Sequence, residues 1–369
     1  MKILKYIIFA LVILNLPSIS LFAFGAAVGG ILSYATIGLL AFYYFLEKKT
    51  EPNWWLIIIS LLYYLISSLL YTGSASEFIL EIIKFFIFLI CGYELTKHIS
   101  TVEFYSFLLI GALSIAAEAL FIPSDYGRFA GFYINANVAG FICITGYAVT
   151  YGLKSTSLKL LGQFIFTLTG LLTFSRTFIV IWVLLNIISL KISIKNVRIF
   201  GIGFLIVGTL FFIDEMVGLN NPRFEQLKSI LNNEDVSSQE INEDSRSETW
   251  AIYYDRIFAS PLIGNGYKTF SVKDGAGEGV HNTYLRIIGE AGILPFLIFI
   301  AYILYLMFWS AFYFKKAPNL IMQIIALSLF LMANHNFFVF YYVSFSAMWI
   351  QYQIYNLKND SNNDEIVLE

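Results

Sequence analysis

The chain has 369 residues, of which 58% are hydrophobic, 18% aromatic and only 13% charged, and its mean hydropathy is +0.73. Soluble domains carry about 25% charged residues, so this composition excludes an ordinary soluble protein and indicates an integral membrane protein. The net charge of -2 gives no sign of a surface for nucleic acid.

Apolar runs long enough to cross a hydrocarbon core of roughly 30 Å recur along the chain, and we count about twelve. They lie at about residues 4–22, 26–46, 54–72, 78–96, 104–122, 130–151, 158–174, 177–191, 199–217, 292–314, 319–334 and 337–355. The runs are continuous and lack period-2 alternation, so they indicate helices rather than barrel strands. We therefore predict an all-α, polytopic integral membrane protein with about twelve transmembrane helices and one large extracytoplasmic loop.

The predicted organisation has four parts. Transmembrane helices 1 to 9 occupy residues 1–217, and the extracytoplasmic loop, with short amphipathic helices, occupies 218–290. Transmembrane helices 10 to 12 occupy 291–355, and a cytoplasmic tail occupies 356–369. We expect an uncleaved first helix, although two lysines before an apolar stretch also resemble a signal peptide.

Positive charge in short connections predicts the orientation, because Lys and Arg are retained on the cytoplasmic side. With the N-terminus inside, the lysines of the short connections fall inside, and the short outer turns hold only Arg128 and Arg176. Both termini are then cytoplasmic, and the long loop lies outside.

Metal and nucleotide chemistry have no support in the sequence. Cys91 and Cys143 lie inside predicted spans and suggest neither a disulfide nor a metal site. Because the chain has no GxxxxGK[ST], CxxC or HExxH pattern, we expect no metal and no cofactor.

The long loop divides into three stretches. NPRFEQLKSIL, residues 221–231, predicts a helix on the membrane surface, and the acidic stretch 232–244 after it is too polar to fold alone. Ser245 and Glu248 then form a capping-box pattern, which predicts a helix with Arg246 in its first turn.

Arg246 carries the wrong charge for the start of a helix. The dipole and the free amide groups there already favour an anion, so a guanidinium indicates a shared anionic ligand. Trp250, Tyr253 and Ile257 follow on one face at helical spacing. That face is either a packed aromatic stripe or a contact with substrate.

A glycine-rich turn then leads to His281, one of three histidines in the chain. His281, Leu285 and Ile288 are spaced to share one side of a helix, which places the imidazole over the outer mouth of the tenth span. A lone histidine is more often structural. Here Arg128, Arg176 and Arg246 fall on the same outer side, and isolated arginines near a membrane are costly unless paired or wet.

These four residues suggest a site for a multiply anionic head group such as a pyrophosphate. Other polar residues have weaker claims. Asn137 either bonds a neighbouring helix or lines the cavity, and Asn282 and Tyr284 either orient His281 or contact sugar. Arg286 is either a further phosphate contact or the partner of Glu290.

The remaining polar residues have simpler interpretations. Glu81 and Lys84, three residues apart, are expected to pair with each other, and Glu118 has no partner that the sequence identifies. Residues 334–336 are read as an outer turn, and His98 lies among cytoplasmic residues.

The succession GRFAGFYINAN, LTFSRT, RSETW, ASPLIGNGYKTF and HNTYLRIIGEAG resembles the O-antigen ligase and O-antigen polymerase superfamily of bacterial polysaccharide assembly. The resemblance covers about residues 125–300, while the first four spans are similar only in hydrophobicity. It implies an inverting, metal-independent glycosyltransferase at the outer, periplasmic face of the bacterial cytoplasmic membrane. On that basis His281 is the general base, Arg246 and Arg176 bind the donor pyrophosphate, and Arg128 assists.

The resemblance also implies the partners and leaves the acceptor open. Donor and acceptor are glycans linked to undecaprenyl pyrophosphate, and a chain-length regulator protein is a further candidate partner. We favour a repeat-unit polymerase because the loop is modest, the tail is short and the chain is rich in Ile, Phe, Tyr and Asn. A ligase to lipid A core and a protein O-oligosaccharyltransferase are the alternatives, and a lipid-linked glycan flippase is the alternative of another class.

Overall fold

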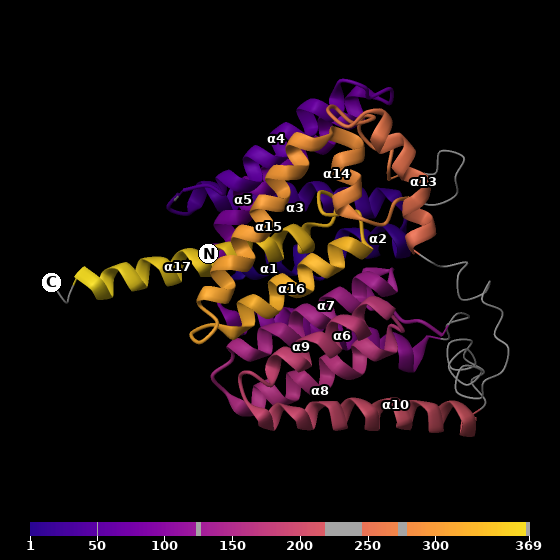
Figure 1. Ribbon diagram of the computed structural model, residues 1–369, viewed down its shortest axis with the longest axis vertical. Helices are drawn as coiled ribbons and strands as arrows, with labels where there is room; N and C mark the ends of the chain where they lie inside the picture. The colour runs from indigo at the N-terminus through magenta and orange to yellow at the C-terminus, as the bar shows by residue number, and fades with distance from the viewer. Residues whose placement is uncertain (50, 123–126, 218–245, 272–278, 367–369) are drawn as a thin grey trace. The chain divides into compact units, whose positions relative to one another are not determined.

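The computed structural model describes residues 1–49, 51–122, 127–217, 246–271 and 279–366 (Figure 1). All regular secondary structure in these ranges is helical. The expected surface helix at 221–231, the acidic stretch 232–244 and the cap at Ser245 lie outside the described residues.

The helices of the first half follow the predicted runs. They are α1 (Lys2–Ile13), α2 (Leu16–Phe24), α3 (Ala26–Leu46), α4 (Trp54–Ser68), α5 (Ala75–Lys97), α6 (Thr101–Phe121), η1 (Gly131–Tyr133), α7 (Ala136–Val149), η2 (Thr150–Gly152) and α8 (Thr156–Leu172). The second half contains α9 (Arg176–Ser189), η3 (Ile194–Val197), α10 (Arg198–Val217), α13 (Arg246–Ala259), α14 (Thr283–Ala291), α15 (Ile293–Phe312), α16 (Pro318–Ala333) and α17 (Tyr341–Ile366).

Every predicted apolar run overlaps at least one helix, but fewer helices meet the length of a span. Among the described residues, α3, α6 and α15 are long and apolar enough to cross a membrane, and the bent pair α1 and α2 makes up to four. Four shorter apolar helices, α4, α8, α9 and α16, accompany them. The apolar helices indicate a multi-pass membrane protein, and the number of twelve spans stays a prediction.

The first run is not one straight helix. Asn15 has a left-handed backbone (φ 54°) between α1 and α2, and the two helices are bent by 63°. Asn tolerates this conformation better than most residues, and Pro17 suits the first turn of the helix that follows. The expectation of a single helix over 4–22 was therefore wrong.

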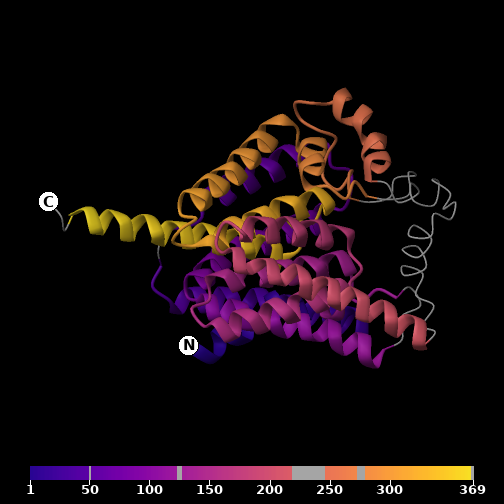
Figure 2. The ribbon, with the colours of Figure 1, turned by 60° about the horizontal axis from the view of Figure 1, so that its bottom comes forward.

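The chain forms two compact units. The first comprises residues 1–100, 246–314 and 327–369, and in it α14 packs against α4 and α15, as Figure 1 shows. The second comprises residues 101–245 and 315–326, in which α7 packs against α6, α8 and α9; these helices belong to the magenta group in Figure 2.

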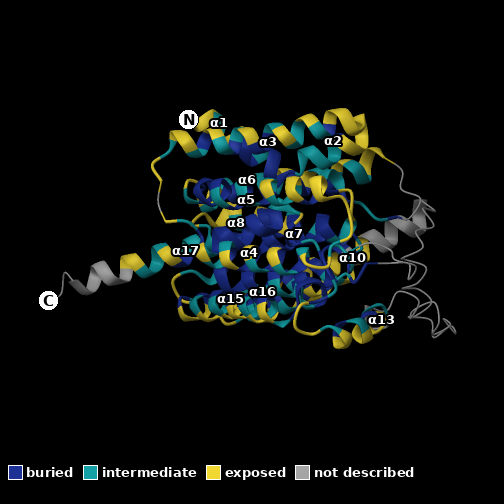
Figure 3. Cartoon of the chain, turned by 90° about the horizontal axis from the view of Figure 1, so that it is seen from above, coloured by how far each residue is buried: buried dark blue, intermediate teal, exposed yellow. Residues whose placement is uncertain are grey.

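The helix α7 is the buried centre of the second unit. All residues from Val138 to Val149 are buried, and the dark blue of this helix in Figure 3 contrasts with the yellow outer face of α3 in the first unit. Close packing is possible because Gly146 faces the ring of Phe166. Asn137, a candidate site residue, lies in the first turn of α7, and Arg128 lies in the segment before it.

Candidate active site

His281 lies just outside a helix rather than within it. Asn282 caps α14, where its Oδ1 accepts hydrogen bonds from the backbone N–H groups of Tyr284 (2.9 Å) and Leu285 (3.1 Å). His281 precedes this cap with a left-handed backbone (φ 45°) and is half-buried. The expectation that a helix carries the imidazole was wrong by two residues, because the cap ends the loop at residue 282.

A second histidine lies beside the first. The ring centroids of His281 and His335 are 5.1 Å apart, with an interplanar angle of 58°. Thr283 donates a hydrogen bond of 2.6 Å to the carbonyl of Asn334, which fastens the turn at 334–336 to the start of α14. Gly279 makes room for His335, since a Cβ there would lie 3.1 Å from Cε1 of that ring. Two of the three histidines of the chain therefore form one pair.

Next to this histidine pair, Arg286 belongs to a buried network of hydrogen bonds. Its Nε lies 3.1 Å from Oε2 of Glu290, and its Nη1 donates to the carbonyl of His335 at 2.9 Å. The hydroxyl of Tyr63 donates to the same carboxylate, and the N–H of Phe270 donates to its Oε1 at 3.2 Å. Burial alone lowers the pKa of Arg286, but the charge of Glu290 raises it above the ordinary value.

Arg286 is 1% exposed, so its donors are out of reach of a phosphate. Of the two roles expected for it, pairing with Glu290 is the one in the structure, and the expectation of substrate binding is corrected. The sequence shows the four-residue spacing but not the burial that decides between the roles.

Replacing Arg286 with Met should destabilise the protein by about 3–5 kcal/mol, because Glu290 would be left as an uncompensated buried charge. Thermal unfolding of the purified protein in detergent measures the loss. The double variant Arg286→Met/Glu290→Gln should recover part of it, and Arg198→Met, at an exposed position, should change little. A folded Arg286→Met protein with only weaker substrate binding would contradict this role.

The helix α13 supports the segment that leads to His281. Tyr253 and Ile257 of α13 form a buried cluster with Phe270 and Val280, and Trp250 packs against it. The stripe expected at helical spacing is thus a packed aromatic face. The indole Nε1 of Trp250 is buried and has no hydrogen-bond partner among the described residues. Its N–H could therefore still donate a hydrogen bond to a ligand.

Tyr284 lies between two helices of the first unit. Its hydroxyl donates to the carbonyl of Ser328 at 3.1 Å, and burial raises its pKa to about 12. Asn282 serves as the cap of α14, as described. Neither contact orients the imidazole of His281, so their expected roles toward the base or the sugar stay predictions.

The rest of the loop is anchored by a charge pair that the sequence did not indicate. Glu81 of α5 pairs with Lys268 at 2.7 Å and accepts a hydrogen bond from Tyr267 at 2.8 Å. Lys84 instead lies 3.9 Å from the centroid of the Tyr34 ring. The expected pairing of Glu81 with Lys84 was therefore wrong, because a distant segment supplied each with another partner.

A second group of candidate residues gathers in the second unit. Arg128 donates from Nη2 to Oδ1 of Asn137 at 3.1 Å and from Nε to the carbonyl of Thr173 at 3.3 Å. Ser175 donates to the same Oδ1 at 3.0 Å and caps α9 through the N–H of Phe178. Arg176, the next residue, is exposed and begins α9. The structure thus brings Arg128, Asn137 and the start of α9 together.

This grouping favours an anion. The N-terminus of α9 carries a positive partial charge from the helix dipole, and two guanidinium groups lie at or next to it. Arg246 likewise is the first residue of its helix, α13. An arginine at the start of a helix costs stability unless an anion offsets its charge, so the starts of α9 and α13 both favour an anionic ligand.

Glu118 orders the segment that carries Arg128. Its Oε2 accepts hydrogen bonds from the N–H groups of Ala130 (2.7 Å) and Gly131 (2.6 Å). The sequence identifies no partner for this carboxylate, because backbone donors leave no signature in side-chain spacing.

If the lipid-linked donor expected from the sequence binds here, Asn137→Ala should raise its KM about two- to tenfold, because the amide that holds Arg128 against Ser175 is lost. Initial rates at varied donor concentration measure the change. Asn196→Ala removes a comparable hydrogen bond, to the carbonyl of Ser189, far along the chain and is the matched control. An unchanged KM would contradict a role for this amide in placing Arg128.

Residues 161–300 match the family model described as O-antigen ligase. The match confirms the resemblance to the O-antigen ligase and polymerase superfamily and supports a membrane enzyme of the ligase or polymerase type. It spans His281, Arg246 and Arg176, whereas Arg128 and Asn137 lie before it. No curated protein matches the chain.

The two groups of residues lie in different units, His281 and Arg246 in the first and Arg128 and Arg176 in the second. Their convergence on one pocket stays a prediction. Within the described residues, no three His, Cys, Asp or Glu side chains are placed to share a metal ion.

Proposed function

We propose that the protein is a membrane glycosyltransferase that polymerises undecaprenyl-pyrophosphate-linked oligosaccharide repeat units into O-antigen or a capsule-like polysaccharide. One observation carries the proposal: the family match contains every candidate catalytic residue, namely His281, Arg246 and Arg176. The arginines at the starts of α9 and α13 support an anionic donor, and the apolar helices support a lipid carrier.

The proposed reaction is a single displacement. The imidazole of His281 takes the proton of an acceptor hydroxyl while that oxygen attacks the anomeric carbon of the donor glycan. The bond from this carbon to the pyrophosphate oxygen breaks, so the configuration inverts and undecaprenyl pyrophosphate departs. A histidine with an ordinary pKa of about 6.5 is mostly neutral near pH 7 and suits this role.

The arginines of the proposed site act on the departing group. Planar guanidinium groups bind phosphate oxygens in pairs and stay charged where water is scarce. Arg176 and Arg246 would hold the pyrophosphate and stabilise its growing charge, and Arg128, held by Asn137, would bring a third cation close. The buried pair of Arg286 and Glu290 would hold α14 and the turn of His335 under the base.

We place this site on the periplasmic face of the bacterial cytoplasmic membrane, with both termini in the cytoplasm. The support is the distribution of Lys and Arg over the connections. Labelling of cysteines introduced at residue 316 and next to His281, in intact cells with a membrane-impermeant reagent, should modify only the second.

The experiment that tests the function is an assay with purified protein and lipid-linked repeat units. A ladder of products that differ by one repeat supports the polymerase. A ligase would instead need lipid A core and transfer each chain once, an alternative favoured by the description of the matched family. Movement of the lipid-linked glycan across a vesicle membrane without any new glycosidic bond would indicate a flippase and overturn the proposal.

A further inference from the structure

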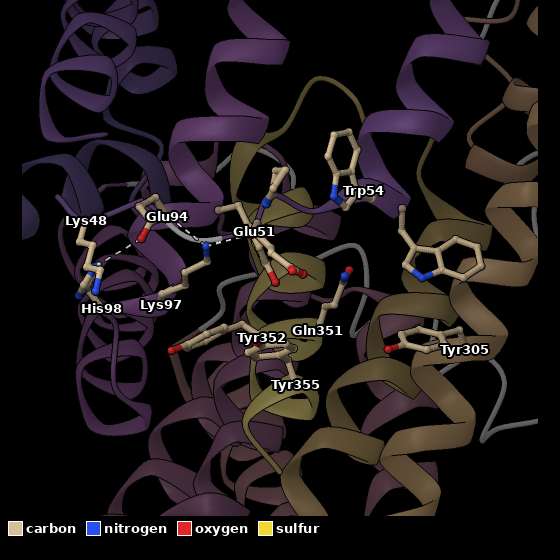
Figure 4. Close-up of a pocket in the computed structure, with 13 residues that line it drawn as sticks. Lys48, Glu51, Trp54, Glu94, Lys97, His98, Tyr305, Gln351, Tyr352 and Tyr355 are labelled. Carbon is tan, nitrogen blue, oxygen red and sulfur yellow. Dashed lines mark hydrogen bonds and ion pairs between the residues drawn. The ribbon is translucent and has the colours of Figure 1, made fainter. Parts of the chain in front are cut away.

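A pocket separate from the candidate active site lies within the first unit (Figure 4). Its volume is about 640 Å³, within the range of small-molecule sites. The connection from α3 to α4, the end of α5 and the faces of α15 and α17 form its walls. None of the residues assigned to glycan transfer lines it.

The charges at one end of the pocket are largely neutralised. Glu94 is buried and pairs with Lys97 at 2.9 Å, while Nε2 of His98 lies 3.7 Å from its other oxygen. Lys97 also donates to the carbonyl of Glu51 at 3.1 Å, which fixes the connection that carries that residue. The charged side chains of Glu94 and Lys97 at this end of the pocket therefore already have partners within the protein.

Two charged side chains in the lining are not neutralised. Within the described part of the chain, neither the ammonium of Lys48 nor the carboxylate of Glu51 has an ion pair or a side-chain hydrogen bond. In Figure 4, Glu51 extends into the middle of the pocket toward Tyr352 and Tyr355, and Lys48 lies at its edge. The pocket thus presents one anion near its centre and one cation at its rim.

Aromatic rings form the opposite wall. Trp55 and Tyr305 have ring centroids 5.5 Å apart, and those of Tyr352 and Tyr355 are 6.4 Å apart with nearly parallel planes. One ring of this wall, that of Tyr305, already has an ammonium group near it, because Nζ of Lys358, which does not line the pocket, lies 4.8 Å from its centroid. Aromatic faces beside a carboxylate are the usual surroundings of a bound alkylammonium.

We propose that this pocket binds a head group of the phosphoethanolamine class. Its ammonium would lie between the Glu51 carboxylate and the tyrosine rings, and its phosphate would meet Lys48. A membrane lipid is one source of this head group, because Lys48 lies just after the end of α3 and Tyr305 lies on α15, and both helices have the length and composition of membrane spans. A soluble phosphoethanolamine ester is the other source.

The test is equilibrium binding to the purified, delipidated full-length protein, measured by native mass spectrometry. Dihexanoyl-phosphatidylethanolamine should bind about tenfold more tightly than dihexanoyl-phosphatidylglycerol, which has the phosphate but no ammonium. Glu51→Gln should abolish this preference, and Lys48→Gln should weaken both ligands. Glu77→Gln and Lys49→Gln, exposed and outside the pocket, remove the same charges and should leave the preference intact.

Glycerophosphoethanolamine, the same head group without acyl chains, distinguishes the sources. If only the lipid binds the pocket, the membrane source is supported. If glycerophosphoethanolamine binds as tightly as the lipid, the membrane source is overturned and a soluble ester is supported. Equal or tighter binding of phosphatidylglycerol to the unaltered protein, or a preference that survives Glu51→Gln, would overturn the proposed head group. The binding needs no glycan transfer, so its result is independent of the proposed enzyme activity.

Discussion

A protein with His281→Asn is expected to lose chain elongation while it still inserts into the membrane at normal levels. General base catalysis contributes roughly 10² to 10⁴ in rate, and asparagine cannot accept the proton of a sugar hydroxyl at neutral pH. Asparagine is the informative substitution because it tolerates the left-handed backbone that His281 adopts (φ 45°). The loss can then be assigned to the imidazole. The purified protein is assayed for product ladders from lipid-linked repeat units.

His281→Ala provides the comparison. Alanine removes the imidazole too but is strained at this φ, so it should be equally inactive and less stable. If the asparagine variant makes full-length glycan at the normal rate, the assignment of the base fails. If both variants are inactive but poorly folded, the histidine is structural.

The sequence predicted the helical class and the places of the helices well, because apolar runs persist whatever the partner helix is. The break at Asn15 was missed, since one asparagine within an apolar run resembles any tolerated polar residue. The early end of α4 at Ser68 was also missed, because the apolar run continues to residue 72, past the residue at which the backbone leaves the helix.

The candidate site was predicted only in part, because local sequence signals reveal helix starts but not contacts between distant residues. Local signals located the starts of α9 and α13, and with them Arg176 and Arg246. Contacts over long separations were not predictable from one sequence. His335 meets His281 from 54 positions away, and Glu81 meets Lys268 from 187 positions away. No spacing rule connects such residues, and for Arg286 only its burial revealed that it serves Glu290.

The two arginines at helix starts lead to the second large effect. Arg176→Lys and Arg246→Lys should each lower kcat/KM for the lipid-linked donor roughly 10- to 150-fold, as expected for the loss of a paired, charge-assisted hydrogen bond. Lysine keeps the positive charge and the aliphatic stem but donates from a single point. A large loss in these variants therefore reports geometry rather than charge.

Arg198 provides a matched control for this experiment. It also begins a helix, α10, and is exposed, but it lies in a connection predicted to be cytoplasmic. Arg198→Lys should leave kcat/KM unchanged if the effect belongs to the donor site rather than to helix starts in general. If all three variants behave alike, the arginines contribute only to helix stability or to the general surface charge.

The double variant Arg176→Lys/Arg246→Lys tests whether both side chains act on the same pyrophosphate. If each single variant is impaired and the double variant loses less activity than the product of the two effects, the two side chains act on one pyrophosphate, which would place both units at a single site.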